Sequence, residues 1–241
     1  MSDNRKLESN DNLADYNSIV AAINYEYCKK YNYDFKYFIP YLTGSTDPLN
    51  ISLDPVTGKL RHCAWAKILS TIYEFNSGYD YIVYIDSDCI FKNFDISLET
   101  FIKDYLSYDL IFLNNKPYMH PECPCSGFYI VKVCNGSKKI LEDWYCFNFA
   151  GRINVARFEQ GAMFYMYKSL NIKVLDLWMF NEEPGQFLRH VCSKVACKRL
   201  EYFKEVLKMK SIDYKSNIDS INTVEYDTTS VALKYNLLKQ R

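Results

Sequence analysis

The sequence predicts an α/β fold in which helices cover both faces of a mostly parallel sheet. Apolar, strand-like runs alternate with helical patterns along the chain, as they do in layered α/β domains. One run, Tyr81–Ile85, is apolar on both faces, which is typical of a central strand in a parallel sheet. Asp86 and Asp88 follow it directly, at the sheet edge where ligands bind in such folds.

The composition fits one large globular domain. The chain has 241 residues, of which 49% are hydrophobic and 24% are charged, so it is not a mainly disordered chain. Basic and acidic residues number 29 each, and this balance argues against nucleic acid or an anionic membrane as the partner. Beyond about residue 211 the sequence is polar and weakly patterned. We therefore predict a main domain over residues 1–210 and an appendage over 211–241; the oligomeric state is left open.

The N-terminal half begins with a helical pattern. Asn12 is expected to cap the first helix, whose apolar residues recur at helical spacing: Leu13, Tyr16, Val20, Ile23 and Tyr27. The aromatic run Tyr33–Phe38 predicts a short strand that ends at Pro40. Residues 43–60 are broken by glycine and proline and predict a loop. Ala64–Phe75 predicts a helix that ends at the Asn76-Ser77-Gly78 run.

The remaining elements follow the strand at residues 81–85 in alternation. The pattern predicts helices over 97–106, 137–147, 159–170 and 198–208, and strands over 110–113, 128–133 and 172–177. No apolar run is long enough for a transmembrane helix, and the polar N-terminus does not resemble a secretory leader. We therefore expect a cytoplasmic protein whose nine cysteines are free thiols.

Asp86-Ser87-Asp88 is the strongest chemical signal in the sequence. Two carboxylates just beyond an apolar strand are costly to leave unpaired there, and a divalent cation would offset their repulsion. Carboxylate oxygens suit Mg²⁺ or Mn²⁺, and such a cation would in turn hold a diphosphate. The alternative interpretation is a solvated turn, which is the usual setting of two nearby aspartates.

Five short segments follow one another in an order that resembles a known family. They are Trp65-Ala66-Lys67, Tyr81–Asp88, Ser126–Lys132, Phe158–Gln160 and Gly185–His190. In this order they resemble the core of glycosyltransferase family 34, the metal-dependent galactosyl-, mannosyl- and xylosyltransferases. The resemblance covers about residues 12–200. It implies the GT-A fold, a Rossmann-type α/β/α sandwich, and a nucleotide-sugar substrate.

The resemblance also implies a metal site. Asp88 and His190 would bind Mn²⁺ or Mg²⁺ directly, and Asp86 would bind it directly or through water and the ribose. Imidazole can serve as such a ligand. The alternative for His190 is an ordinary surface histidine.

Further residues are implied at the donor and at the sugar. The resemblance implies that Lys67, Ser87 and Lys194 contact the donor nucleotide and its diphosphate. It implies that Glu159, Gln160 and again Lys67 act in catalysis. Glu159 would stabilise positive charge and Gln160 would bond sugar hydroxyls. Each has a plainer interpretation. Lys67 could be a solvated lysine whose stem covers Trp65, Glu159 could simply favour a helix N-terminus, and Lys194 could belong to a basic cluster with Lys198 and Arg199.

The implied reaction is transfer of a hexose from a nucleoside-diphosphate sugar, with UDP-sugar favoured, to a hydroxyl of a glycan or glycoprotein. Retention of configuration is implied, and the sequence offers no convincing second carboxylate for a covalent intermediate. An inactive sugar-nucleotide-binding relative and a sugar nucleotidyltransferase remain as alternatives. A metal-dependent nuclease would require a basic substrate face, which the neutral charge balance disfavours. The high share of aromatic residues, 17%, favours either an AT-rich genome, microbial or viral, or an aromatic-lined sugar cleft.

Three departures from the family pattern bear on these expectations. The family opens with a nucleotide-binding strand, whereas residues 1–10 are too polar for a good strand, so this segment is either a degenerate strand or a shortened one. Cys125 stands where the family tends to have asparagine. The membrane anchor of the Golgi enzymes has no counterpart in the sequence.

Overall fold

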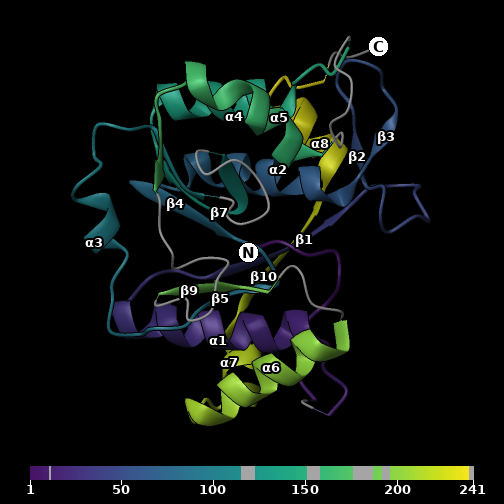
Figure 1. Ribbon diagram of the computed structural model, residues 1–241. Helices are drawn as coiled ribbons and strands as arrows, with labels where there is room; N and C mark the ends of the chain where they lie inside the picture. Colours follow the sequence, from purple (N-terminus) through teal and green to yellow (C-terminus); the bar gives the residue numbers. More distant parts are fainter. Residues whose placement is uncertain (11, 115–122, 151–157, 176–186, 192–195, 239–241) are drawn as a thin grey trace. The chain divides into compact units, whose positions relative to one another are not determined.

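The computed structural model describes residues 1–10, 12–114, 123–150, 158–175, 187–191 and 196–238 (Figure 1). The chain forms two compact units. Unit 1 is Met1–Ile39, Ile85–Asp104 and Leu177–Val224, and unit 2 is Pro40–Tyr84, Tyr105–Asp176 and Glu225–Arg241. The chain passes between the units within β1 (Lys36–Tyr41), β4 (Tyr81–Ile85) and β10 (Asn222–Asp227), and β1 pairs with β10.

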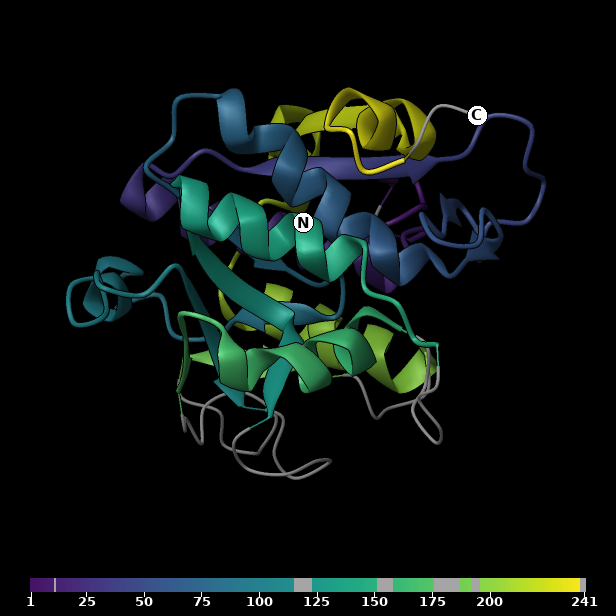
Figure 2. The same cartoon turned by 90° about the horizontal axis from the view of Figure 1, so that it is seen from above.

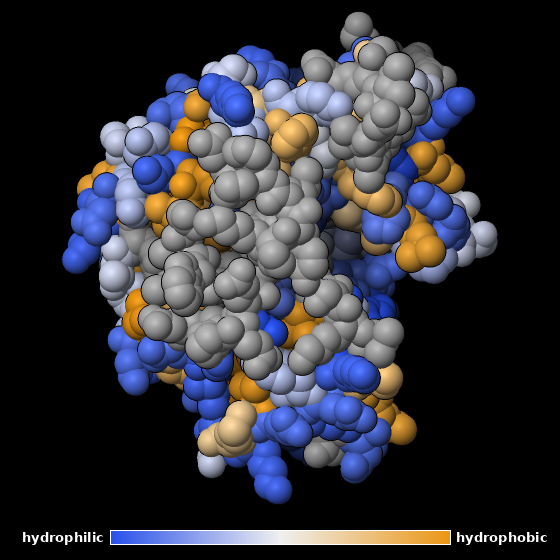
Figure 3. Space-filling model, in the orientation of Figure 1, coloured by the Kyte–Doolittle hydropathy of each residue, from blue (hydrophilic) through white to orange (hydrophobic). Residues whose placement is uncertain are grey.

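Unit 1 is built around one long helix, α1 (Tyr16–Tyr31). Two helices lie against it, α6 (Ala196–Met209) and α7 (Tyr214–Ser220), and so does the strand β5 (Cys89–Phe91) (Figure 1). β5 pairs antiparallel with β9 (Leu188–His190), and the short helix α3 is Glu99–Ile102. Figure 3 shows a mainly hydrophilic surface over α6, whereas its Phe203 and Val206 are buried, which is the amphipathic pattern of a surface helix.

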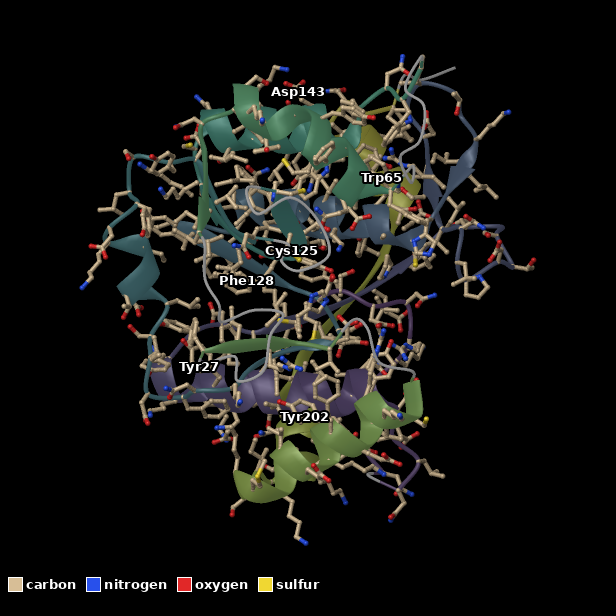
Figure 4. All side chains as sticks on the ribbon, in the orientation of Figure 1. Tyr27, Trp65, Cys125, Phe128, Asp143 and Tyr202 are labelled. Atoms are coloured by element: carbon tan, nitrogen blue, oxygen red, sulfur yellow. The ribbon has the colours of Figure 1, made fainter. Side chains whose placement is uncertain are left out.

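Aromatic residues form the core of unit 1. Tyr27 of α1 (labelled in Figure 4) is fully buried, and its ring stacks on Phe91 of β5 with centroids 3.8 Å apart. Phe187, just before β9, meets the same ring edge-on at 6.0 Å. This packing holds β5 and β9 against α1, because each ring buries a large apolar area among the others. Both strands flank the candidate site described below.

Unit 2 contains the main sheet, in the strand order β4-β7-β6-β8. β6 (Leu110–Asn114) pairs antiparallel with β7 (Pro124–Lys132) and parallel with β8 (Ile172–Leu175). α5 (Glu159–Met166) packs on β7, while α2 (Ala66–Tyr73) and α4 (Asn135–Tyr145) run side by side (Figure 2). The smaller elements of unit 2 are β2 (Ser52–Leu53), β3 (Leu60–Arg61), η1 (Cys63–Trp65), η2 (Glu74–Asn76), η3 (Tyr167–Ser169) and α8 (Thr228–Lys234).

The predicted α/β fold class is confirmed, and several elements lie where the pattern indicated. β4 has the predicted bounds, but it stands at the end of the strand order of its sheet, and only Tyr84 and Ile85 of its five residues are buried. The described structure therefore does not give it the buried central position that the sequence predicted, because an apolar run alone does not fix a strand's place in a sheet. The helices predicted over 64–75, 137–147 and 198–208 correspond to η1–α2–η2, α4 and α6. The helix predicted over 97–106 shrinks to the single turn α3.

The prediction for the first helix was wrong at its start. α1 begins at Tyr16, and its N-cap is Asp15, whose carboxylate accepts the Tyr16 backbone N–H. Leu13, taken as the first apolar position, is 72% exposed. The following strand also starts later than predicted, at Lys36, and continues through Pro40 to Tyr41.

Two segments expected to lack strands take part in pairing. The predicted loop over 43–60 contains β2 and part of β3, which pair antiparallel with Ser52 opposite Arg61. Near the N-terminus, Ser2 makes parallel bridges to both Phe38 and Asp86. The polar N-terminal segment therefore supplies a minimal strand contact beside the first aspartate, which agrees with the degenerate-strand interpretation.

The residues beyond 211 form regular structure in both units. α7 packs on α1, and its Asn217 donates to the Ala22 carbonyl at 3.1 Å. α8 packs on α2 and β2, where Thr228 donates to the Ile51 carbonyl at 2.6 Å. Both helices also bury apolar residues, Ile218 in α7 and Val231 and Ala232 in α8, but helices of seven residues are too short to show a clear period in the sequence. A domain boundary at residue 210 stays a prediction.

Two sequence expectations concern the cysteines and the helices. Eight cysteines of the described part of the chain form no disulfide: Cys28, Cys63, Cys89, Cys123, Cys125, Cys134, Cys146 and Cys197. Burial raises the pKa of the Cys123 thiol to about 11, which favours its neutral form over a metal-binding thiolate. Among the described residues, no helix is both long enough and apolar enough to cross a bilayer.

Candidate functional site

A tight turn presents the two aspartates of unit 1. The Cys89 N–H donates to the Asp86 carbonyl at 3.1 Å, which closes Asp86-Ser87-Asp88-Cys89 into a turn. The turn begins where β4 ends, and Ser2 bridges to Asp86 on its other side. Both carboxylates are thereby held by hydrogen-bonded backbone, with their side chains partly exposed.

Strand pairing brings His190 to this turn from about a hundred residues away. In the β5–β9 ladder Cys89 lies opposite His190, and the Val191 N–H donates to the Asp88 carbonyl at 2.9 Å. The register places the imidazole beside Asp88. Neither three-residue strand was predicted, because such short runs carry no readable period.

Asn24 of α1 fixes β5 in place. Its side-chain amide donates to the Cys89 carbonyl at 2.9 Å and accepts from the Phe91 N–H at 3.0 Å, and the residue is fully buried. One side chain thus satisfies two backbone groups of β5 that would otherwise lack partners in the core. Sequence reasoning missed this residue, although an asparagine among the apolar residues of the helix was a usable signal; Asn17, seven residues earlier, is buried as well.

Asp86, Asp88 and His190 form a compact cluster. One ligand atom from each lies within 4.8 Å of the other two. Asp88 Oδ1 is 3.0 Å from His190 Nε2, and Asp88 Oδ2 is 3.1 Å from Arg199 Nη1. The side chains of Asp88 and His190 are 14% and 9% exposed, so they are largely shielded from water.

The donor atoms of this cluster fit a divalent cation. Two carboxylates and one imidazole are a set that Mn²⁺ or Mg²⁺ accepts. Ligands on opposite sides of Mg²⁺ lie about 4 Å apart, close to the spread of these three atoms. The structure therefore brings together the three residues predicted to bind metal, and Ser87 lies in the same turn.

Unit 2 holds a second, fully buried polar cluster. Lys67 of α2 and Glu159, the first residue of α5, form an ion pair with Nζ and Oε1 2.9 Å apart. The two residues are 6% and 4% exposed. Lys67 also donates to the Ser126 carbonyl at 3.3 Å and lies over the Tyr84 ring. Lys67 is therefore not the solvated lysine of the plainer interpretation.

Hydrogen bonds tie this pair to β7 and α4. Ser126 Oγ donates to Glu159 Oε1 at 2.9 Å, and Trp144 Nε1 donates to the Glu159 carbonyl at 2.7 Å. Gln160 accepts from the Ser126 N–H at 2.6 Å and donates to the Pro124 carbonyl. The side chains implied at the sugar thus join α2, β7 and α5, and these bonds favour a role in assembling the unit.

The charge of Glu159 depends on its neighbours. Burial alone would raise its pKa, but the attraction of Lys67 and the hydrogen bonds from Lys67 and Ser126 outweigh burial and hold the pKa below the ordinary 4.5. The carboxylate therefore stays ionised at neutral pH, although it is completely buried. Its second oxygen, Oε2, has no hydrogen-bond partner among the described residues.

The remaining predicted residue, Lys194, lies outside the described residues. Arg199, which the sequence offered only as one member of a basic cluster, instead contacts the metal-site carboxylate Asp88. No charge pattern could have found this contact, since the two residues lie in elements far apart in the sequence.

Comparison with known proteins supports the fold. No family model matches the sequence, and no curated protein matches it. Among solved structures 31 chains match, one of which is described as a glycosyltransferase involved in the glycosylation of the major capsid of PBCV-1. The TM-score is 0.62 and the identity 15%, and the match covers 85% of this chain and 97% of that chain. The chain therefore has a fold similar to that of a glycosyltransferase.

Proposed function

We propose that this protein is a divalent-metal-dependent glycosyltransferase. The observation that carries the proposal is the convergence of Asp86, Asp88 and His190 at one point of unit 1. The fold is similar to that of a solved glycosyltransferase, and this likeness supports the same class of reaction. The GT-A fold and membership of family 34 stay part of the proposal.

The proposed reaction moves a hexose from a nucleoside-diphosphate sugar, with UDP-sugar favoured, to a hydroxyl of a glycan or glycoprotein. The acceptor oxygen bonds to the anomeric carbon as the bond to the diphosphate oxygen breaks, and the hydroxyl proton passes to the departing diphosphate. We propose attack from the face that the diphosphate leaves, so that the anomeric configuration is retained. An acceptor on a glycoprotein accords with the structural neighbour, which is involved in the glycosylation of a major capsid.

The geometry of the described residues supports some of the proposed residue roles and leaves the others as predictions. Asp86, Asp88 and His190 would hold Mn²⁺ or Mg²⁺, which when bound acts as a Lewis acid toward the diphosphate. Ser87 and Lys194 are proposed at the donor. Catalytic roles for Lys67, Glu159 and Gln160 stay predictions, since their described hydrogen bonds are made within unit 2.

The deciding experiment is a donor screen with the full chain. UDP-glucose, UDP-galactose and GDP-mannose are added with Mn²⁺ or with EDTA, and both the thermal midpoint and donor hydrolysis are measured. We expect one donor to raise the midpoint by mass action and to be hydrolysed, in both cases only with Mn²⁺. Hydrolysis that survives exhaustive chelation would contradict the metal-dependent mechanism.

Two alternatives give different results in the same screen. An inactive relative would bind a donor without hydrolysing it. A nucleotidyltransferase would form UDP-sugar from UTP and a sugar 1-phosphate, so this pair of substrates is included. A cytoplasmic location and an AT-rich or viral source stay predictions.

A further inference from the structure

Arg199 is a fixed positive charge on the candidate metal site. Its Nη1 lies 3.1 Å from Asp88 Oδ2, while the other oxygen of the same carboxylate faces His190 Nε2 at 3.0 Å. Asp88 therefore has an ordinary ligand residue on one oxygen and a guanidinium on the other. The Arg199 side chain is 20% exposed, so the pair is only partly screened by solvent.

The position of Arg199 is set by packing. α6 lies against α1 and buries Phe203 and Val206. The Arg199 guanidinium carbon lies 5.5 Å from the centre of the Tyr16 ring, at the start of α1. Arg5 lies over the same ring at 4.3 Å, but its charge is paired with Asp3 and Asp15. Arg199 is the guanidinium that the structure directs to Asp88.

The formal charges show what this arrangement favours. The Arg199 guanidinium and the Asp88 carboxylate carry opposite charges, and their contact neutralises both. A divalent cation bound to Asp88 would add positive charge beside this guanidinium in a largely shielded place. Arg199 therefore opposes a cation that binds alone. The positive excess disappears when an anion such as a diphosphate arrives with the cation.

We propose that Arg199 couples cation binding at Asp86, Asp88 and His190 to binding of the donor's diphosphate. The guanidinium neutralises Asp88 in the free protein, weakens the binding of a cation alone and favours the cation together with a diphosphate. This inference rests on the proposed function, because it requires the metal site. It adds an order to binding: the chain holds its cation firmly only when a nucleotide is present.

The test is an Mn²⁺ titration of the full chain, with and without saturating UDP, followed by the EPR signal of free Mn²⁺ and by calorimetry. In the wild type we expect UDP to tighten Mn²⁺ binding by about 5- to 150-fold, the usual range of coupling between sites. Arg199→Gln should bind Mn²⁺ alone several-fold more tightly, and the effect of UDP should shrink to about a third or less of the wild-type factor.

Two variants serve as controls. Arg199→Lys keeps the charge and should show strong coupling by UDP. Lys198→Gln removes one charge from the exposed neighbouring position and should titrate like the wild type, since solvent screens that side chain. The thermal midpoint of each variant is measured first. If Arg199→Gln does not fold, Arg199→Met, which keeps the aliphatic stem over Tyr16, replaces it.

Two results would overturn the inference. One is Mn²⁺ binding to Arg199→Gln that is unchanged or weaker than in the wild type, and the other is an undiminished effect of UDP. If Asp88→Asn abolishes Mn²⁺ binding while Arg199→Gln changes nothing, the metal site stands and only the role of Arg199 is wrong. If the wild type binds no Mn²⁺ even with saturating UDP, both proposals fail.

Discussion

The two polar clusters of this protein differ in how their charges are balanced. In unit 2, Lys67 and Glu159 neutralise each other, are almost completely buried, and are bonded to β7 and α4. In unit 1, Asp86 and Asp88 bring two carboxylates to a partly exposed turn beside His190, and Arg199 contacts one of them, Asp88. The first cluster is a buried pair of opposite charges, whereas the second gathers the atoms of three possible metal ligands.

This difference favours a structural role for the first cluster and a ligand-binding role for the second. A buried pair of opposite charges needs no counter-ion, and breaking it damages the fold. Two carboxylates and an imidazole held close together are a donor set that a divalent cation would stabilise. The comparison therefore predicts that substitutions in unit 2 act mainly on stability and substitutions at the turn act mainly on cation binding and activity.

The largest effect should come from Asp88→Asn. The fold should persist, because the turn is held by its backbone, while the rate of transfer falls about a hundredfold or more; a metal ligand supports several kcal/mol of transition-state stabilisation. Initial rates at saturating Mn²⁺ provide the measurement. Asp143→Asn, at an exposed helix position, should keep full activity. An Asp88→Asn rate within about twofold of the wild-type rate would show that the turn is not part of the active site.

Breaking the buried pair should give the largest loss of stability. Glu159→Gln or Lys67→Met alone should lower the free energy of unfolding by about 3–5 kcal/mol, because each leaves a buried charge without its partner. The double variant Lys67→Met/Glu159→Leu should regain much of this loss. Urea unfolding measures all three, and Lys139→Gln, in an exposed pair, should cost less than about 1 kcal/mol. Additive single effects would show that the two side chains do not act as a pair.

His190→Ala tests whether the cluster extends beyond the turn. We expect the Mn²⁺ concentration for half-maximal rate to rise about tenfold or more, since loss of an outer partner of a metal ligand alone typically costs 10- to 100-fold. Excess Mn²⁺ should partly restore the rate. His62→Ala is the matched control, because His62 instead accepts from the Ala64 N–H. Superimposable Mn²⁺ curves for wild type and His190→Ala would exclude His190 as a ligand.

The smallest expected effect is a pH dependence of the free energy of unfolding, which Glu159 of unit 2 should cause. Because the pKa of Glu159 is lower in the folded than in the unfolded chain, its stabilising contribution is present above pH 4.5 and disappears as the pH falls through the folded value. The difference in unfolding free energy between wild type and Glu159→Gln should be constant from pH 7 to about 5 and narrow below that. A difference that widens in acid would mean that the folded-state pKa is raised.

Particular residues show how much of the candidate site could be predicted from the sequence. Tyr81–Ile85 could be predicted as a strand because it is a short run of β-branched and aromatic residues, and the aspartates after it drew attention because ligands bind at the carboxyl ends of strands in such folds. His190 was named through the family resemblance alone. The geometry that joins it to Asp88 depends on β5 and β9, whose three-residue strands are stabilised by each other and by Asn24.

The sequence by itself determined the fold class, the bounds of β4 and the two aspartates of the candidate metal site, because these follow from local periodicity and from residue chemistry at a strand end. The tertiary structure alone decided that Lys67 is buried against Glu159 and that Arg199 contacts Asp88. Both are pairings of charges from elements distant in the sequence. A charged side chain looks the same in the sequence whether water or an opposite charge solvates it, so only the folded chain distinguishes the two.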